Sequence, residues 1–103
     1  MRFLIQMTMP VEAGNAAVRD GRLARTLESA LGALKPEAAY FTTVNGERTG
    51  FIVCDMQDAS QMPAIAEPFF LGLGARVEFH PAMTLEDLQK AGPSFEEIIK
   101  NYG

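Results

Sequence analysis

Apolar residues occupy every second position from Phe3 to Met9, with a less apolar residue between most of them. A period of two is that of a β-strand, whose successive side chains point to opposite faces of a sheet. Pro10 lacks a backbone N–H and is expected to end the strand. Residues 2–9 are therefore predicted to form a first strand with one strongly apolar face.

Two later stretches of the chain have the spacing of apolar residues that is typical of helices. Leu23, Leu27 and Leu31 recur at four-residue intervals within a helix predicted to end near Lys35. A second helix is expected to begin near residues 58–61, where either Asp58 or Ser60 can cap it, and Ser60 is favoured because Pro63 then falls in the first turn. Pro68 should limit this helix to roughly three turns or fewer, so residues 71–74 are predicted to form a loop.

Asn45-Gly46 separates two β-rich segments, residues 38–44 and 47–56. This dipeptide takes positive φ at both central positions of a tight turn, so the segments should form an antiparallel hairpin. The register of such a hairpin gives two faces that are both apolar. One face carries Tyr40, Phe51 and Val53, and the other carries Phe41, Ile52 and Cys54.

The last strand is predicted at residues 75–82, where Val77 and Phe79 alternate with polar neighbours. Thr84–Asp87 and Ser94–Glu97 then have the form of two helix starts, so a helical tail is expected. The full order predicts an α+β, ferredoxin-like βαββαβ fold with a four-stranded antiparallel sheet. We expect one domain over residues 1–103, with a core at 1–83 and the helical tail at 84–103.

Composition excludes several classes of protein. A chain of 103 residues has room for one domain, and its net charge of -4 disfavours nucleic acid as a partner. The single Cys54 cannot form an intramolecular disulfide, which favours a reducing cytoplasm. No stretch approaches the roughly 20 apolar residues of a membrane helix.

One face of the predicted sheet lacks a cover, because two helices shield only one side. In a lone chain Leu4, Ile52, Met56 and either Tyr40 or Phe41 would then be exposed as an apolar patch. We therefore expect a second copy to pack face to face about a twofold axis, as a homodimer enclosing a barrel-like space. The sequence leaves open whether such dimers assemble further.

The succession "FIVCDMQDASQMPAIAEPFF" followed by "ARVEFHPAM" resembles the dimeric alpha/beta-barrel superfamily over roughly residues 1–83. That superfamily includes muconolactone isomerase-like and antibiotic-biosynthesis monooxygenase-like proteins, and the likeness is greatest to small bacterial families of unknown function. The resemblance implies a dimeric α/β barrel with a cleft for a small molecule. Superfamily members do unrelated chemistry there, so the fold does not settle the function.

Candidate chemistry centres on His80, which either lines the cavity as a general base or ends a strand in solvent. Glu78 and Arg76 share its face; they either orient the imidazole and hold an anion, or form an ion pair that sets dimer register. One histidine without an acidic cluster does not predict a metal site, and no cofactor motif occurs. The further ligand-binding candidates are Gln6, Tyr40 and Arg48.

Two functions follow from these residues. The first is a cytoplasmic homodimer that binds a small, partly apolar molecule as a cofactor-independent isomerase, lyase or monooxygenase, with His80 and Glu78 as catalytic residues. The second is a non-catalytic module in which ligand sensing or dimerisation itself is the role. The sequence does not decide between them.

Overall fold

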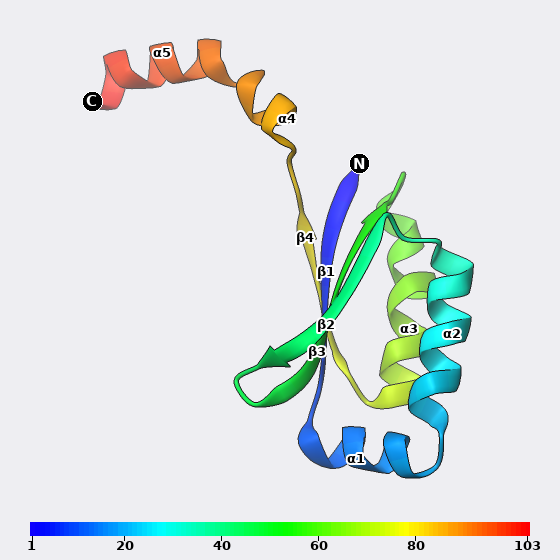
Figure 1. Ribbon diagram of the computed structural model, residues 1–103. Coiled ribbons are helices and arrows are strands. Elements are labelled where there is room, and N and C mark those ends of the chain that lie inside the picture. Colours follow the sequence, from blue (N-terminus) through cyan, green and yellow to red (C-terminus); the bar gives the residue numbers. More distant parts are fainter.

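The computed structural model describes residues 1–103 and has four antiparallel strands in the order β2-β3-β1-β4. The elements are β1 (Arg2–Met9), α1 (Val11–Arg19), α2 (Arg22–Leu34), β2 (Ala38–Val44), β3 (Glu47–Asp55), η1 (Ala59–Gln61), α3 (Met62–Leu73), β4 (Arg76–Pro81), α4 (Leu85–Gln89) and α5 (Gly92–Tyr102). Helices α2 and α3 lie side by side over one face of the sheet (Figure 1). The predicted α+β, ferredoxin-like fold is confirmed.

The hydrophobic core lies between the sheet and these two helices. Ile5, Met7 and Ile52 from the sheet are fully buried, as is Phe69 of α3. Full burial of a large apolar side chain stabilises the fold by about 1.5–3 kcal/mol. Ile52 and Met56 thus belong to the core, and the expectation that a lone chain exposes them is wrong.

The hairpin forms as predicted. Asn45 and Gly46 have φ values of 53° and 76°, and the strands pair with Val44 opposite Glu47. Glycine tolerates this left-handed backbone without strain, and asparagine tolerates it better than most residues. The predicted register is therefore confirmed, and it fixes which hairpin side chains share a face.

Helix α1 is an element that the apolar spacing did not predict. It begins directly after Pro10, which forms no side-chain cap, and it buries only the small residues Gly14 and Ala17. A helix without large apolar residues on its buried face gives no leucine stripe. The chain therefore carries two helices, joined at Gly21 with φ 78°, before β2.

Helix α3 differs from its prediction at both ends. Asp58 caps the preceding turn η1, because its carboxylate accepts a hydrogen bond of 2.8 Å from the backbone N–H of Ser60, whereas α3 itself begins after Gln61 without a side-chain cap. The expectation that Ser60 caps the helix is wrong. Pro68 lies inside the helix, which continues to Leu73 and is followed by Gly74 in the left-handed conformation, so residues 71–73 of the expected loop are helical.

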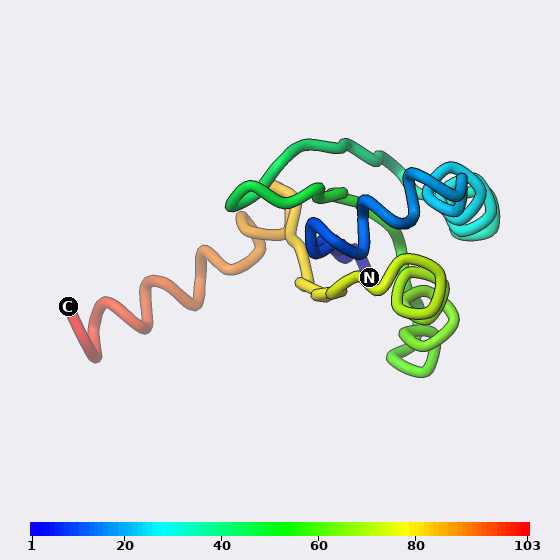
Figure 2. Tube along the Cα trace, turned by 90° about the horizontal axis from the view of Figure 1, so that it is seen from below, coloured from blue at the N-terminus to red at the C-terminus, as the bar shows by residue number.

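The tail at the C-terminal end projects away from the rest of the chain. The molecule measures 58 × 28 × 20 Å with a radius of gyration of 17.2 Å, against about 13 Å for a compact chain of this length. Figure 2 shows α5 extending from the sheet on the side opposite α2 and α3. The predicted start of α4 is confirmed by the capping box between Thr84 and Asp87, whereas α5 begins at Gly92, before Ser94. None of the helices has the length and apolar character required to cross a membrane.

Candidate functional site on the open face of the sheet

The sheet face opposite α2 and α3 carries a row of apolar side chains. Strand pairing places Leu4 beside Val53 and Gln6 beside Phe51, which in turn pairs with Tyr40. None of these four apolar residues is fully buried, and Tyr40 is 72% exposed. We call Leu4, Tyr40, Phe51 and Val53 the apolar row.

A polar cavity of about 200 Å³ adjoins this row. Gln6 of β1 lies directly between Phe51 of β3 and Glu78 of β4, and Thr8 lies opposite Arg76. We call this cavity the polar notch. Its lining consists of Gln6, Thr8, Val44, Asn45, Glu47, Arg76 and Glu78.

Charged and hydroxyl groups in the polar notch are partnered with one another or with neighbouring residues. The guanidinium of Arg76 donates to the carboxylate of Glu47 in an ion pair. The hydroxyl of Thr49 donates to the backbone oxygen of Glu47 at 3.1 Å and lies 3.4 Å from the hydroxyl of Thr8. With Glu78, the notch is lined by two carboxyl side chains and one guanidinium.

His80 lies on the same face, one pair of residues further along β4 than Glu78. Its Nε2 is 3.4 Å from Oε2 of Glu78, and the two side chains are 53% and 63% exposed. A carboxylate at this distance can orient the imidazole. The pair is open to any molecule that reaches this face of the sheet.

The structure brings four of the six predicted site residues together and separates the other two. Gln6, Glu78, Arg76 and His80 adjoin one another on β1 and β4. Tyr40 shares their face but lies on β2, two strands from Gln6 and three strands from the residues of β4. Arg48 lies on the helix side, where its Nη2 donates to Oδ1 of Asn15 at 3.1 Å.

Glu47 and Thr8 line the polar notch but were missed among the candidate residues. The signal for Glu47 was present, because a two-residue turn places it opposite Val44, on the same face as Thr49 and Phe51. The same alternation assigns Arg48 to the other face. The ion pair between Glu47 and Arg76 depends on strand order, which the hairpin alone does not give.

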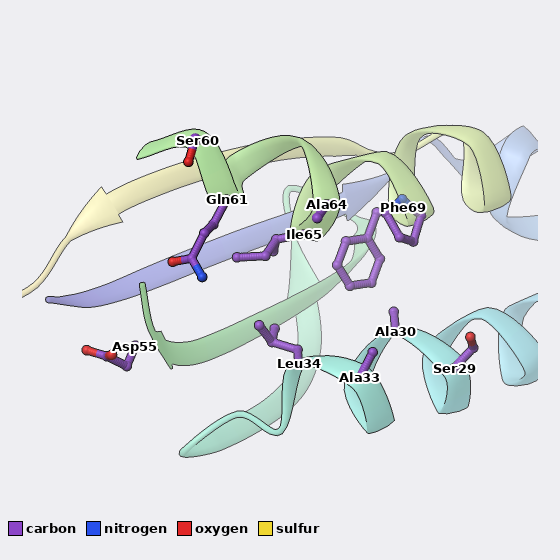
Figure 3. Close-up of a pocket in the computed structure, with 11 residues that line it drawn as sticks. Ser29, Ala30, Ala33, Leu34, Asp55, Ser60, Gln61, Ala64, Ile65 and Phe69 are labelled. Atoms are coloured by element: carbon purple, nitrogen blue, oxygen red, sulfur yellow. The ribbon is translucent and has the colours of Figure 1, made fainter. Parts of the chain in front are cut away.

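A larger groove of about 540 Å³ lies between α2 and α3 (Figure 3). Ala30 and Ala33 of α2 face Ile65 and Phe69 of α3 across it, so its floor is apolar. Its only ionisable side chain is Asp55, and Gln61 is already engaged in the cap of η1. This groove offers apolar surface but few groups for chemistry.

No three histidine, cysteine, aspartate or glutamate side chains gather closely enough to hold a metal ion. Cys54 is buried in the core, and burial raises the pKa of its thiol, with a further contribution from the neighbouring Asp55. A thiol with a raised pKa is a poor nucleophile and a poor metal ligand. The ionisable chemistry of the open face thus rests on His80, Glu78, Arg76 and Glu47.

Comparison with known protein families places the chain in one of them. Residues 1–95 match the family described as "Domain of unknown function (DUF3303)", so the chain belongs to that family. No curated protein matches the chain.

Proposed function

We propose that this protein is a cytoplasmic homodimer that binds a small, partly apolar molecule between the open faces of two sheets. The observation that carries the proposal is the juxtaposition of the apolar row and the polar notch on a face that no helix covers. A structure with both helices on one side leaves this face to a partner or a ligand. The architecture agrees with the resemblance to dimeric alpha/beta-barrel proteins.

A second copy is the partner that fits this face. Phe51 and Tyr40 on neighbouring strands expose apolar surface that a lone chain leaves in contact with water. Removing apolar surface from water contributes about 25 cal/mol per Å². A twofold axis would bring two apolar rows together and enclose two polar notches between them.

The charge of the polar notch selects the polar part of the ligand. Because Glu47 already occupies the guanidinium of Arg76, an anionic ligand would meet the carboxylate of Glu78 without a free cation beside it. A hydroxyl, amide or amine can instead donate to Glu78 and to the side-chain oxygen of Gln6. We propose a ligand with an apolar body and a hydrogen-bond-donating group.

His80 gives this site the means for proton transfer. Its Nε2 faces Glu78, which leaves Nδ1 to take a proton from a substrate C–H group and return it at another position. Gln6 on the adjacent strand can donate to a substrate carbonyl while the charge develops. This sequence of steps is that of a cofactor-independent isomerase, and it needs neither an oxidant nor a reductant.

A non-catalytic ligand sensor is the second candidate. The observation that favours it is the mutual pairing of the charged groups, Arg76 with Glu47 and His80 with Glu78. Charged groups that are partnered within the chain can hold a ligand in place without taking part in turnover.

Native mass spectrometry of the protein as purified tests the binding proposal. We expect the dimer to carry a bound small molecule, and we expect Gln6→Leu to lose it while the matched control Gln57→Leu, in an exposed loop, retains it. His80→Ala then separates the two functions. A bound molecule that is converted by the native protein but not by His80→Ala supports the isomerase, and an unconverted one supports the sensor. A folded dimer that carries no molecule from any preparation would overturn the binding proposal.

A further inference from the structure

We infer that the tail of each copy packs with its apolar face on the body of the other copy. We call residues 84–103 the arm. The inference rests on the proposed homodimer and adds a second contact to it. Its starting observation is that α5 places Phe95, Ile98, Ile99 and Tyr102 at the spacing i, i+3, i+4, i+7, and all four are exposed. This spacing forms one apolar stripe along a helix.

The arm lies where its own body cannot cover it. Neither the sheet nor α2 and α3 pack along α5. Figures 1 and 2 show the arm leaving the end of β4 toward the open side of the sheet, away from both helices of the same chain. This is the side on which the second sheet of the proposed dimer would lie.

The length of the arm suits a second copy. Two packed sheets are about 10 Å apart, and the 11 residues of α5 span about 16 Å at 1.5 Å per residue. The arm therefore extends beyond the second sheet and alongside the body of that copy. Because the contact is reciprocal about a twofold axis, two arms would clasp the dimer.

The area of the open face supports the same conclusion. Four strands at about 4.8 Å spacing, with about seven residues each at 3.3 Å, present roughly 450 Å² in projection. A stable interface buries about 800 Å² on each partner. The apolar stripes of two arms supply the surface that the sheet alone lacks.

Charge argues against a membrane as the occupant of this stripe. The arm contains four carboxylates, Glu86, Asp87, Glu96 and Glu97, against two lysines, Lys90 and Lys100. Amphipathic helices that lie on membranes carry an excess of lysine and arginine that attracts anionic lipid. The net negative arm would be repelled.

Photocrosslinking between two isotopically distinct copies tests the inference. p-Benzoylphenylalanine replaces Ile98 on the apolar stripe of an unlabelled chain, which is mixed with ¹⁵N-labelled chain until the subunits exchange. We expect the probe to join unlabelled arm peptides to ¹⁵N-labelled body peptides. The matched control replaces Lys100, on the other side of α5, and should give several-fold less of this product. Crosslinks confined to the unlabelled chain, or equal yields from both positions, would overturn the inference.

The charge variant Phe51→Lys distinguishes a failure of the clasp from a failure of the proposed homodimer. A native dimer without crosslinks between copies refutes the clasp and leaves the paired sheets standing. Crosslinks between copies of a dimer that Phe51→Lys does not weaken support the clasp and refute the paired sheets. A monomeric native chain refutes both.

Discussion

Gly72 of α3 lies so close to Thr26 of α2 that a side chain at position 72 would have no room. A Cβ built on Gly72 would come within 2.9 Å of both Cγ2 and Oγ1 of Thr26. Nη1 of Arg22 also donates to the backbone oxygen of Gly72 at 2.9 Å, which ties the two helices together at the same point. The helical layer that leaves the opposite sheet face uncovered is thus held at a defined separation.

Substitution of this glycine tests that contact. We expect Gly72→Ala to lower the free energy of unfolding by up to about 2 kcal/mol, because overpacking costs roughly 1–3 kcal/mol and the higher helix propensity of alanine offsets about 1 kcal/mol of this. The matched control is Gly32→Ala in α2, where nothing lies within 4 Å of the added Cβ, and it should gain up to about 1 kcal/mol. Urea unfolding of both variants measures the difference, and equal effects at the two sites would contradict the close packing.

The strands and their faces could be predicted because a period of two is read directly from the sequence. Phe3 to Met9 gave β1, and Asn45-Gly46 gave both the turn and its register. The helices were harder to predict. Pro68 did not end α3, because the buried Phe69 and Leu73 beyond it anchor the last turn in the core.

The candidate site was predicted in part for the same reason. Gln6, Glu78 and His80 follow from strand alternation and the strand order of the fold. Arg48 was grouped with them although alternation assigns it to the helix side, where it meets Asn15 of the unpredicted helix α1. The partnership of Arg76 with Glu47 joins residues from β4 and β3 that do not pair directly, so only the folded sheet reveals it.

Cys54 should resist modification in the native state. Its side chain is 2% exposed, and burial raises the pKa of the thiol, so little reactive thiolate forms at neutral pH. We expect Ellman's reagent to react at least an order of magnitude more slowly with the folded chain than with the chain in guanidinium chloride. Rapid reaction under native conditions would place Cys54 outside the core.

Because Asp58 caps η1 with its carboxylate, the stability of the native state should depend on pH. The backbone N–H of Ser60 donates to this carboxylate and lowers its pKa below the ordinary value. A lowered folded-state pKa stabilises the native state above about pH 3.9 and loses that contribution as pH falls through the folded value. We expect the melting temperature of the native chain to exceed that of Asp58→Asn at pH 6 and the gap to close by about pH 2.

Glu67→Gln on the exposed side of α3 is the control for this pH series. Thermal unfolding followed by circular dichroism at each pH measures the three chains together. A gap between native protein and Asp58→Asn that stays constant across the range would show that the cap does not depend on ionisation.

The central claim is that the open face of the sheet packs against a second copy, and sedimentation equilibrium of native protein and Phe51→Lys tests it most directly. Phe51 lies in the middle of the apolar row, whereas the control Thr43→Lys adds the same charge on the helix side of β2. At micromolar concentration we expect the native protein and Thr43→Lys to sediment at twice the chain mass of 11.2 kDa. Phe51→Lys should sediment as a folded single chain. A native protein that sediments at 11.2 kDa, and that unfolds cooperatively in a separate denaturation experiment, would contradict the account.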